Sequence, residues 1–179
     1  MNYEIVELKE KTIVGFAGRT SNDDPKMGAV ISGLWQKLYT PENVSGTRNR
    51  VNTYAIGLYS DYEKEGYQVT AGFEVSKACA LEGQVTKVIP AGKYAKFQIH
   101  GDYVEAVSNA WSEIWNTPLD RTYTGDFEEY RTMEDIDIYI AIRYEQNLRI
   151  ENEVLYGSQI VSDRISVNGK RQHDSERIS

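Results

Sequence analysis

The chain has 179 residues, of which 40% are hydrophobic, and a formal net charge of −7 at pH 7. This length and apolar content fit one ordinary hydrophobic core and exclude global disorder, while the acidic balance argues against nucleic acid as a partner because phosphate binding needs a basic surface. No apolar run approaches the roughly 20 residues that span a bilayer, and the start does not resemble a signal peptide, so we expect a cytoplasmic protein without a membrane partner.

The first half of the chain predicts two strands, a helix and a hairpin. Residues 3–8 and 12–19 have the pattern of half-buried strands. Asp24 and Pro25 have the residue types of an N-cap and a first helical position, and Pro41 is a stop signal beyond the helix. Residues 41–50 are predicted to be a polar loop. The expected hairpin strands are 53–59 and 67–75, and the apolar face of the helix holds Met27, Val30, Ile31, Leu34, Trp35 and Leu38.

The second half predicts the same elements again. Residues 84–89 and 93–99 are expected strands joined by a turn, and Asp102 with Glu105 has the spacing of a capping box that begins a helix. Residues 126–131 and 136–143 are predicted to form the last hairpin, in which four alternating isoleucines share one face. The stretch 145–179 is polar, and we expect it to be a partly flexible C-terminal extension of the domain 1–144.

A duplicated motif links the two halves. The letters WQKLYTP at 35–41 are echoed by WSEIWNTP at 111–118, each late in a helical pattern and each before two further strands. The chain therefore predicts two strand–helix–strand–strand repeats, about 1–80 and 81–144. Two such units bury faces against each other, and the seam between repeats is a frequent place for a small-molecule pocket.

Several short motifs in a fixed order resemble the GyrI-like superfamily, which includes the effector-binding domains of AraC- and MerR-type transcription regulators. They are YAIGLY (54–59), AGFEV (71–75), IPAGKYAKF (89–97), GDY (101–103), WSEIW (111–115), DFEEY (126–130) and IYIAI (138–142). The likeness covers residues 1–144 and is strongest to small stand-alone members encoded in integron cassettes. Asp102 and Ala141 depart from the family pattern, which usually has proline at each place.

The resemblance implies an α+β fold: an antiparallel sheet with two long helices, built from repeats related by a pseudo-twofold axis. It also implies a cleft between the repeats that binds cationic drug-like molecules. Glu128 best matches the family's pocket glutamate, and Glu74 is the alternative in the first repeat. An apolar pocket disfavours an empty carboxylate, and a bound cation restores its charged form. Glu129 points to the opposite face in a regular strand, so which of the two glutamates faces the pocket stays open.

The aromatic residues are candidates for the walls of this cleft. The chain has 13 tyrosines and three tryptophans, and tyrosine joins a flat apolar face to a polar tip. Trp111, Tyr139, Tyr103 and Tyr54 are the predicted lining residues, each with a core position as its alternative reading. Tyr139 is expected to stack on a ligand from a strand adjacent to that of Glu128.

Binding without catalysis is the function that these features favour. No phosphate-binding loop or nucleophile elbow occurs, the two histidines lie far apart, and the single cysteine excludes an internal disulfide, so no cofactor and no metal are expected. Two alternatives remain: a GyrI-like hydrolase of electrophilic molecules, and a gyrase-inhibitor-like interaction module. Because no helix-turn-helix segment is found, a role in transcription requires a regulator partner chain; a homodimer is the other partner considered.

Overall fold

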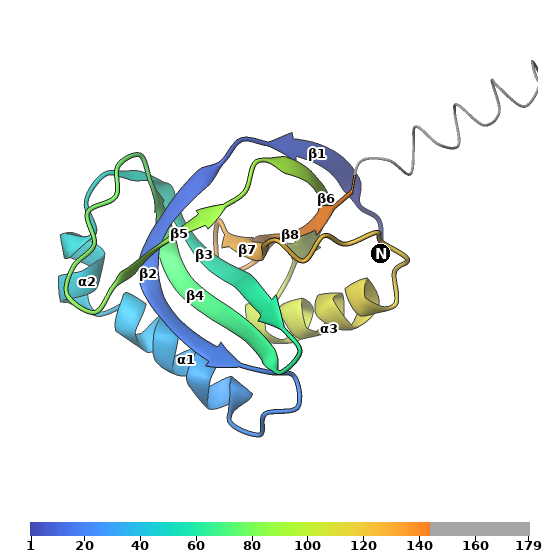
Figure 1. Ribbon diagram of the computed structural model, residues 1–179, viewed down its shortest axis with the longest axis horizontal. Coiled ribbons are helices and arrows are strands. Elements are labelled where there is room, and N and C mark those ends of the chain that lie inside the picture. Colours follow the sequence, from blue (N-terminus) through green and yellow to red (C-terminus); the bar gives the residue numbers. More distant parts are fainter. Residues whose placement is uncertain (144–179) are drawn as a thin grey trace, which may run out of the picture. The chain divides into compact units, whose positions relative to one another are not determined.

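The computed structural model describes residues 1–143. Eight strands form one antiparallel sheet in the order β1-β6-β8-β7-β3-β4-β2-β5. Figure 1 shows the sheet strongly curled, with α1 and α3 along the same side of it. No helix in this part of the chain is long and apolar enough to cross a membrane. The bounds are β1 Glu4–Leu8, β2 Lys11–Thr20, α1 Met27–Leu38, α2 Pro41–Gly46, β3 Arg50–Glu63, β4 Gly66–Val75, β5 Val85–Ile89, β6 Gly92–His100, α3 Tyr103–Trp115, β7 Asp126–Tyr130 and β8 Asp135–Ile142.

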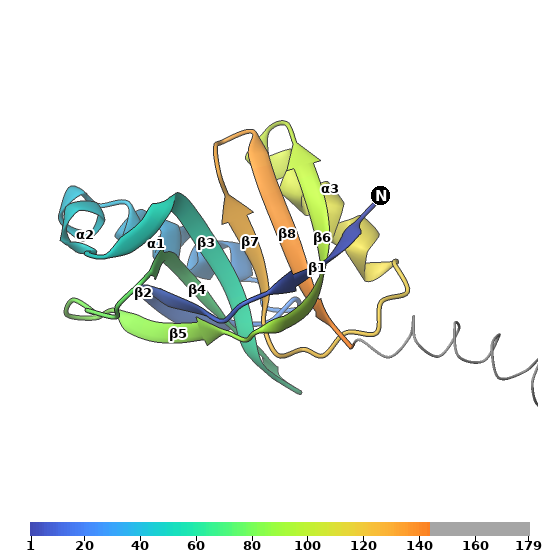
Figure 2. The ribbon, with the colours of Figure 1, turned by 90° about the horizontal axis from the view of Figure 1, so that it is seen from above.

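The centre of the sheet is the pair formed by β3 and β7, which are far apart in the sequence (Figure 2). Outward from β7 the order is β8, β6 and β1, and outward from β3 it is β4, β2 and β5. The edge strand β1 therefore pairs with β6 rather than with β2, and β5 pairs with β2 rather than with β6. Each edge strand thus lies in the opposite half of the sheet from the strand that follows it in the sequence.

Strand alternation divides the apolar residues between the two faces of the sheet. On β3, Ile56 and Leu58 belong to a core on the face away from the helices, while Ala55 packs in the core beneath α1. A third core lies beneath α3, and there the predicted isoleucine face of β8 is confirmed, since Ile136, Ile138 and Ile140 are buried in it and Ile142 packs against it. The two long helices, α1 and α3, therefore cover one face of the sheet, and the apolar side chains of the other face form a separate core.

Helix α3 begins where the sequence predicted. The Asp102 carboxylate accepts hydrogen bonds from the backbone N–H groups of Val104 and Glu105, as an N-cap does. Helix α1, in contrast, begins at Met27 and not at Asp24. The Asp24 carboxylate instead accepts from the backbone N–H of Lys26 and closes a turn before the helix. The predicted start was wrong because an Asp-Pro pair suits a turn as well as a helix.

The predicted loop at 41–50 contains a short helix. In α2, Thr40 is the N-cap and its side chain accepts from the backbone N–H of Asn43, with Pro41 in the first turn. Pro41 was interpreted only as a stop signal for α1. Because proline suits the first helical turn, the same residue ends one helix and begins another. The predicted extension 145–179 lies outside the described residues.

Candidate functional site

A cavity of about 480 Å³ opens between α1 and α3 over the sheet. Its volume lies within the range of small-molecule sites. Its walls come from both helices, from the β3–β4 hairpin and from the loop before β7, so segments distant in the sequence meet there. The lining residues are Asn22, Met27, Ile31, Tyr59, Tyr62, Tyr67, Ser108, Trp111, Ser112, Trp115, Arg121 and Tyr123.

Aromatic rings in successive contact form the largest part of this lining. Starting from Trp111, the ring centroids of neighbouring members lie 5.3, 5.7, 5.8 and 5.5 Å apart. We call this set the aromatic row; its members in order are Trp111, Tyr59, Tyr67, Tyr62 and Tyr123. Ring pairs at these distances stabilise each other, and a row of them offers ring faces and edges to a flat ligand.

Glu128 lies directly behind one end of the aromatic row. Its Oε1 accepts hydrogen bonds from Trp111 Nε1 at 2.6 Å and from the Tyr59 hydroxyl at 3.0 Å, and its Oε2 accepts from the Tyr130 hydroxyl at 2.7 Å. The side chain does not itself line the cavity, and the residue is only 3% exposed. The carboxylate is therefore a buried acceptor held by three neutral donors.

The charge of this carboxylate has no cationic partner among residues 1–143. Burial raises the pKa of Glu128, and the hydrogen bonds from Trp111, Tyr130 and Tyr59 oppose that rise in part. Burial and the nearby Glu128 charge raise the pKa values of Tyr59 and Tyr130, so both hydroxyls stay protonated and remain donors. The site thus holds negative charge through neutral groups alone.

A glycine makes room for the carboxylate. Gly57 of β3 stands opposite Glu128 of β7 in the register. A Cβ atom at position 57 would lie 3.0 Å from Glu128 Oε2 and 3.2 Å from Cζ2 of Trp35. Trp35 of α1 also meets the ring of Tyr130 edge-on at 5.2 Å. The carboxylate therefore lies over the centre of the sheet, between a tryptophan of each long helix.

Of the predicted lining residues, Trp111 lines the cavity and Tyr139 does not. Tyr139 is 7% exposed and lies in the core of the opposite face, where its ring stacks on Phe127 at 4.4 Å. The register explains this, because Tyr139 pairs with Phe127 while Glu128 pairs with Ile138. The prediction that Tyr139 stacks on a ligand next to Glu128 is therefore wrong. Paired residues of adjacent strands lie on the same face of a sheet, and the partner of Tyr139 is Phe127, which points away from the face of Glu128.

The other predicted residues also lie outside the cavity lining. Glu74 is on β4, where its carboxylate forms an ion pair with Lys11 Nζ at 2.7 Å; the residue facing Glu128 across the centre of the sheet is Gly57 instead. Tyr54 is half-buried on β3, and Tyr103 is 40% exposed at the start of α3. Glu74, unlike Glu128, therefore already has a cationic partner within the protein.

Sequence reasoning missed the tyrosines of the β3–β4 hairpin. Residues three apart face opposite sides of a regular strand, yet Tyr59 and Tyr62 both line the cavity. A register shift between Ser60 and Glu63 makes this possible, with Asp61 at a positive φ of 49° between them. The density of tyrosine near this turn was the available signal, but the bulge that aims both rings inward cannot be seen in the alternation.

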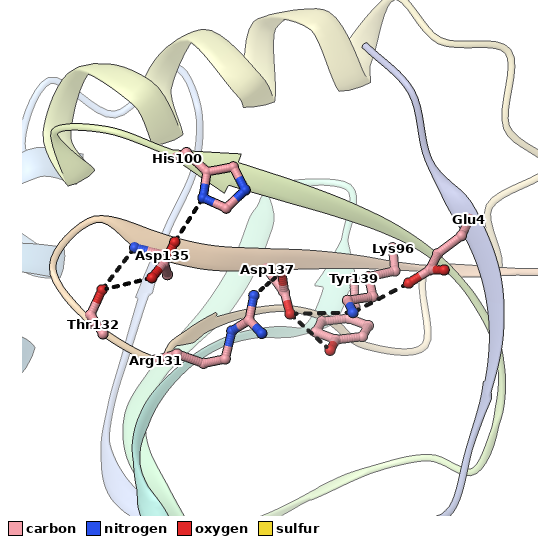
Figure 3. Close-up of polar contacts among 8 residues, drawn as sticks. All are labelled: Glu4, Lys96, His100, Arg131, Thr132, Asp135, Asp137 and Tyr139. Atoms are coloured by element: carbon pink, nitrogen blue, oxygen red, sulfur yellow. Dashed lines mark hydrogen bonds and ion pairs between the residues drawn. The ribbon is translucent and has the colours of Figure 1, made fainter.

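The opposite face of β7 and β8 has a different polar character (Figure 3). Asp137, 1% exposed, accepts from Arg131 Nη2 at 2.9 Å and lies 3.5 Å from Lys96 Nζ. On this face burial and the charges of Asp137 and Glu74 raise the pKa of Glu129, while the charges of Lys11 and Arg131 lower it in part. Cations and carboxylates are mixed here, whereas Glu128 has no cation near it among residues 1–143.

Comparison with known proteins identifies the family. The model of the integron-associated effector binding protein family, Cass2, matches residues 4–142. The chain belongs to this family. The integron cassette protein VCH_CASS2 from the mobile metagenome of Vibrio cholerae is 30% identical, with a TM-score of 0.66 over 79% of this chain and 95% of that one. The predicted resemblance to integron-encoded effector-binding proteins is thus confirmed.

Two more distant structures share the fold. SAV2435, solved bound to tetraphenylphosphonium, has a TM-score of 0.69 at 16% identity, over 82% of this chain and 97% of that one. A protein from Staphylococcus aureus described as a putative bacterial transcription regulation protein has a TM-score of 0.63 at 17% identity, over 80% and 99%. No curated protein sequence matches the chain. This chain therefore belongs to a family of integron-associated effector-binding proteins and shares the fold of these two structures.

Proposed function

We propose that this Cass2-family protein binds cationic aromatic or amphipathic molecules, without catalysis, in the cavity between α1 and α3. One observation carries the proposal: Glu128 is a buried carboxylate behind an aromatic wall, and only neutral donors hold it. A buried charge without an opposite charge is unfavourable. A ligand cation bound against the cavity side of this wall would supply that charge and gain affinity from it.

The wall itself favours a cation. Tyr59 and Trp111 line the cavity and donate their polar hydrogens to Glu128 behind them. Donation to a carboxylate makes the rings richer in electrons, and a cation is attracted to the negative face of an aromatic ring. The ligand therefore need not reach the carboxylate, because the two rings carry its influence into the cavity.

The arrangement of the sheet supports the location of the site. The strand order outward from β3 has the same pattern as the order outward from β7, with one long helix over each side. We interpret this as two repeats related by a pseudo-twofold axis between β3 and β7, as the duplicated tryptophan motifs predict. Glu128 and Gly57 would then lie at the axis, where the cavity draws residues from both repeats.

The test is a pair of probes with the same shape and opposite charge. Tetraphenylphosphonium is the bound molecule of the structural relative SAV2435, and tetraphenylborate is its anionic counterpart. Titration calorimetry should show binding of the cation and not of the anion. Glu128→Gln should weaken the cation at least tenfold, about 1.4 kcal/mol, because the amide keeps the shape but loses the charge.

Glu129→Gln is the matched control, since it makes the same change one residue away on the opposite face. It should leave the affinity for the cation within about twofold of wild type, about 0.4 kcal/mol. Equal binding of both probes, or equal loss in both variants, would contradict the proposal. Hydrolysis of an electrophilic substrate that is lost in Glu128→Gln would favour the hydrolase alternative instead.

A further inference from the structure

The other end of the aromatic row carries a positively charged residue. Arg121 lines the cavity next to Tyr62 and Tyr123, and its guanidinium carbon lies 4.4 Å from the centroid of the Tyr123 ring. Glu128 is at the Trp111 and Tyr59 end of the same row. The row therefore runs from a buried carboxylate to a guanidinium, with Tyr67 between them.

Arg121 is fixed in place and is not a mobile surface arginine. Its Nη2 donates to the carboxylate of Asp126, which is 0% exposed. Asp126 also accepts from the Tyr62 hydroxyl at 2.7 Å and from the backbone N–H of Ala141 at 2.8 Å. Asp126 is held from the strands on either side, by Tyr62 of β3 and Ala141 of β8, and it holds the guanidinium at the cavity wall.

Most of the donors of this guanidinium remain unused. A guanidinium has five N–H donors. Among residues 1–143, its hydrogen-bond acceptor is the Asp126 carboxylate, which Nη2 contacts; Nε is buried without a partner, and Nη1 has none. Because Nε is buried, the unused donors that remain for a ligand are those of the Nη groups, and Nη1 has no acceptor among these residues.

The charges around the cavity decide which ligand group suits these donors. Asp126 already neutralises Arg121, so the two ends of the row together carry the single negative charge of Glu128. A ligand with one positive charge balances that charge, whereas a second, anionic group would compete with Asp126 for the guanidinium. A neutral oxygen acceptor, such as a carbonyl, can take the free N–H groups without disturbing the balance.

We propose that Arg121 is a second ligand anchor, and that the cavity selects aromatic monocations bearing a neutral carbonyl acceptor on a ring attached to the cationic ring system. This inference rests on the proposed cation-binding function and names the class of effector. The cationic ring system lies along the aromatic row towards Trp111 and Tyr59, at the end nearest Glu128. The carbonyl oxygen accepts a hydrogen bond from Arg121 at the Tyr123 end.

Three dyes that share one xanthylium cation test the inference. Tetramethylrosamine has no oxygen on its pendant phenyl ring, tetramethylrhodamine methyl ester has a neutral ester carbonyl there, and tetramethylrhodamine has a carboxylate. Fluorescence anisotropy should show the methyl ester binding at least fivefold tighter than the other two. The inference is overturned if the rosamine binds as tightly as the ester, or if the carboxylate dye binds tightest.

A double variant connects the preference to Arg121. Arg121→Met with Asp126→Asn removes both charges of the pair, so that no buried charge is left unpaired. The ester should lose its advantage over the rosamine, so the ratio of the two affinities, at least fivefold in the unmodified protein, should fall to about one in the double variant. An ester advantage that persists in a folded double variant overturns the assignment to Arg121. If that variant does not fold, the three dyes on the unmodified protein still decide between the outcomes.

Failure of this inference can be distinguished from failure of the proposed function. Glu128→Gln should weaken all three dyes by a similar factor, because it removes the charge that the shared cation meets. Equal affinities of the ester and the rosamine, with both weakened by Glu128→Gln, overturn only the role of Arg121. If none of the three dyes binds, both proposals are overturned.

Discussion

Glu128 and Glu129 are consecutive residues of one strand, and both are buried, yet they have opposite surroundings. Glu128 faces the helices and accepts hydrogen bonds only from neutral rings and hydroxyls. Glu129 faces the other side of the sheet, where Lys11 and Arg131 lower its pKa against the effect of burial. Cations near Glu129 thus oppose in part the rise of its pKa that burial, Asp137 and Glu74 cause, whereas Glu128 has no cation near it in the described part of the chain.

In the proposed function, this difference separates a structural charge from a ligand-binding charge on one strand. Side chains alternate between the faces of a strand, so two adjacent glutamates can serve unrelated purposes without interfering. Hydrogen bonds from neutral donors keep a carboxylate in place without cancelling its charge, whereas an ion pair cancels it. The proposal therefore assigns the external cation to the helix face, while the opposite face holds the ion pairs of Asp137.

The largest expected effect is on the face of Glu129. Asp137→Ala removes the buried carboxylate that Arg131 and Lys96 contact, and leaves both cations without it. We expect the free energy of unfolding to fall by about 3 kcal/mol, measured by urea denaturation. The folded variant should still bind tetraphenylphosphonium like wild type. Weakened binding without loss of stability would show that the two faces are coupled.

A smaller effect is expected from filling the space beside Glu128. Gly57→Ala places a Cβ atom against the carboxylate and against Trp35, which should lower the free energy of unfolding by about 2 kcal/mol and weaken cation binding. Gly33→Ala is the control, because a Cβ atom there meets nothing within 4 Å and alanine favours a helix. Similar results for both variants in thermal melts and titrations would mean that the close approach is not needed.

Removing one donor from Glu128 should have a still smaller effect. Trp111→Phe keeps an aromatic ring in the cavity wall but removes the hydrogen bond at 2.6 Å, so the free energy of unfolding should fall by about 1.5 kcal/mol. Trp115→Phe is the matched control, since Trp115 also lines the cavity but is 57% exposed. Chemical denaturation of both variants measures the difference. Equal stability of the two variants would argue against a structural role for this bond.

The smallest effect is expected from pH. Because burial raises the pKa of Glu128 above its ordinary 4.5, the protonated form is populated at higher pH than in a free glutamate. Affinity for tetraphenylphosphonium should be constant at alkaline pH and fall as the pH drops through this raised value, levelling off near the affinity of Glu128→Gln. Stability depends on pH in the opposite sense, because burial favours the protonated form of Glu128. The contribution of Glu128 to the free energy of unfolding is full below its pKa in the unfolded chain, and it is lost as the pH rises through the raised pKa of the folded protein.

Titrations between pH 8 and pH 5 measure the profile. Glu129→Gln should retain the pH dependence of wild type, and Glu128→Gln should abolish it, because the ligand itself does not titrate. Trp111→Phe removes a hydrogen bond that lowers the pKa of Glu128, so its profile should shift to higher pH. A pH dependence that survives Glu128→Gln would assign the titrating group to another residue.

Most of the element boundaries follow from local pattern, and so does the placing of Glu128 and Glu129 on opposite faces, but not which of the two faces the helices. The alternation in β7 placed consecutive glutamates on opposite faces, and the spacing around Asp102 predicted the start of α3. The start of α1 and the helix α2 were missed, because Asp24 and Pro41 belong to residue types that serve turns, caps and first helical turns alike. Such signals are ambiguous until neighbouring hydrogen bonds are formed.

Periodicity and capping act over a few residues, so the sequence by itself predicted most of the strand–helix order. The family and the candidate carboxylate Glu128 followed from the resemblance of its motifs to the GyrI-like superfamily. Only the tertiary structure decided which aromatic rings meet that carboxylate. Tyr139 was assigned to the wrong face because register is a property of two paired strands. Tyr62 reached the cavity through a bulge, and Arg121 through its ion pair with Asp126. Contacts between distant segments depend on pairing and packing, which no single stretch of sequence encodes.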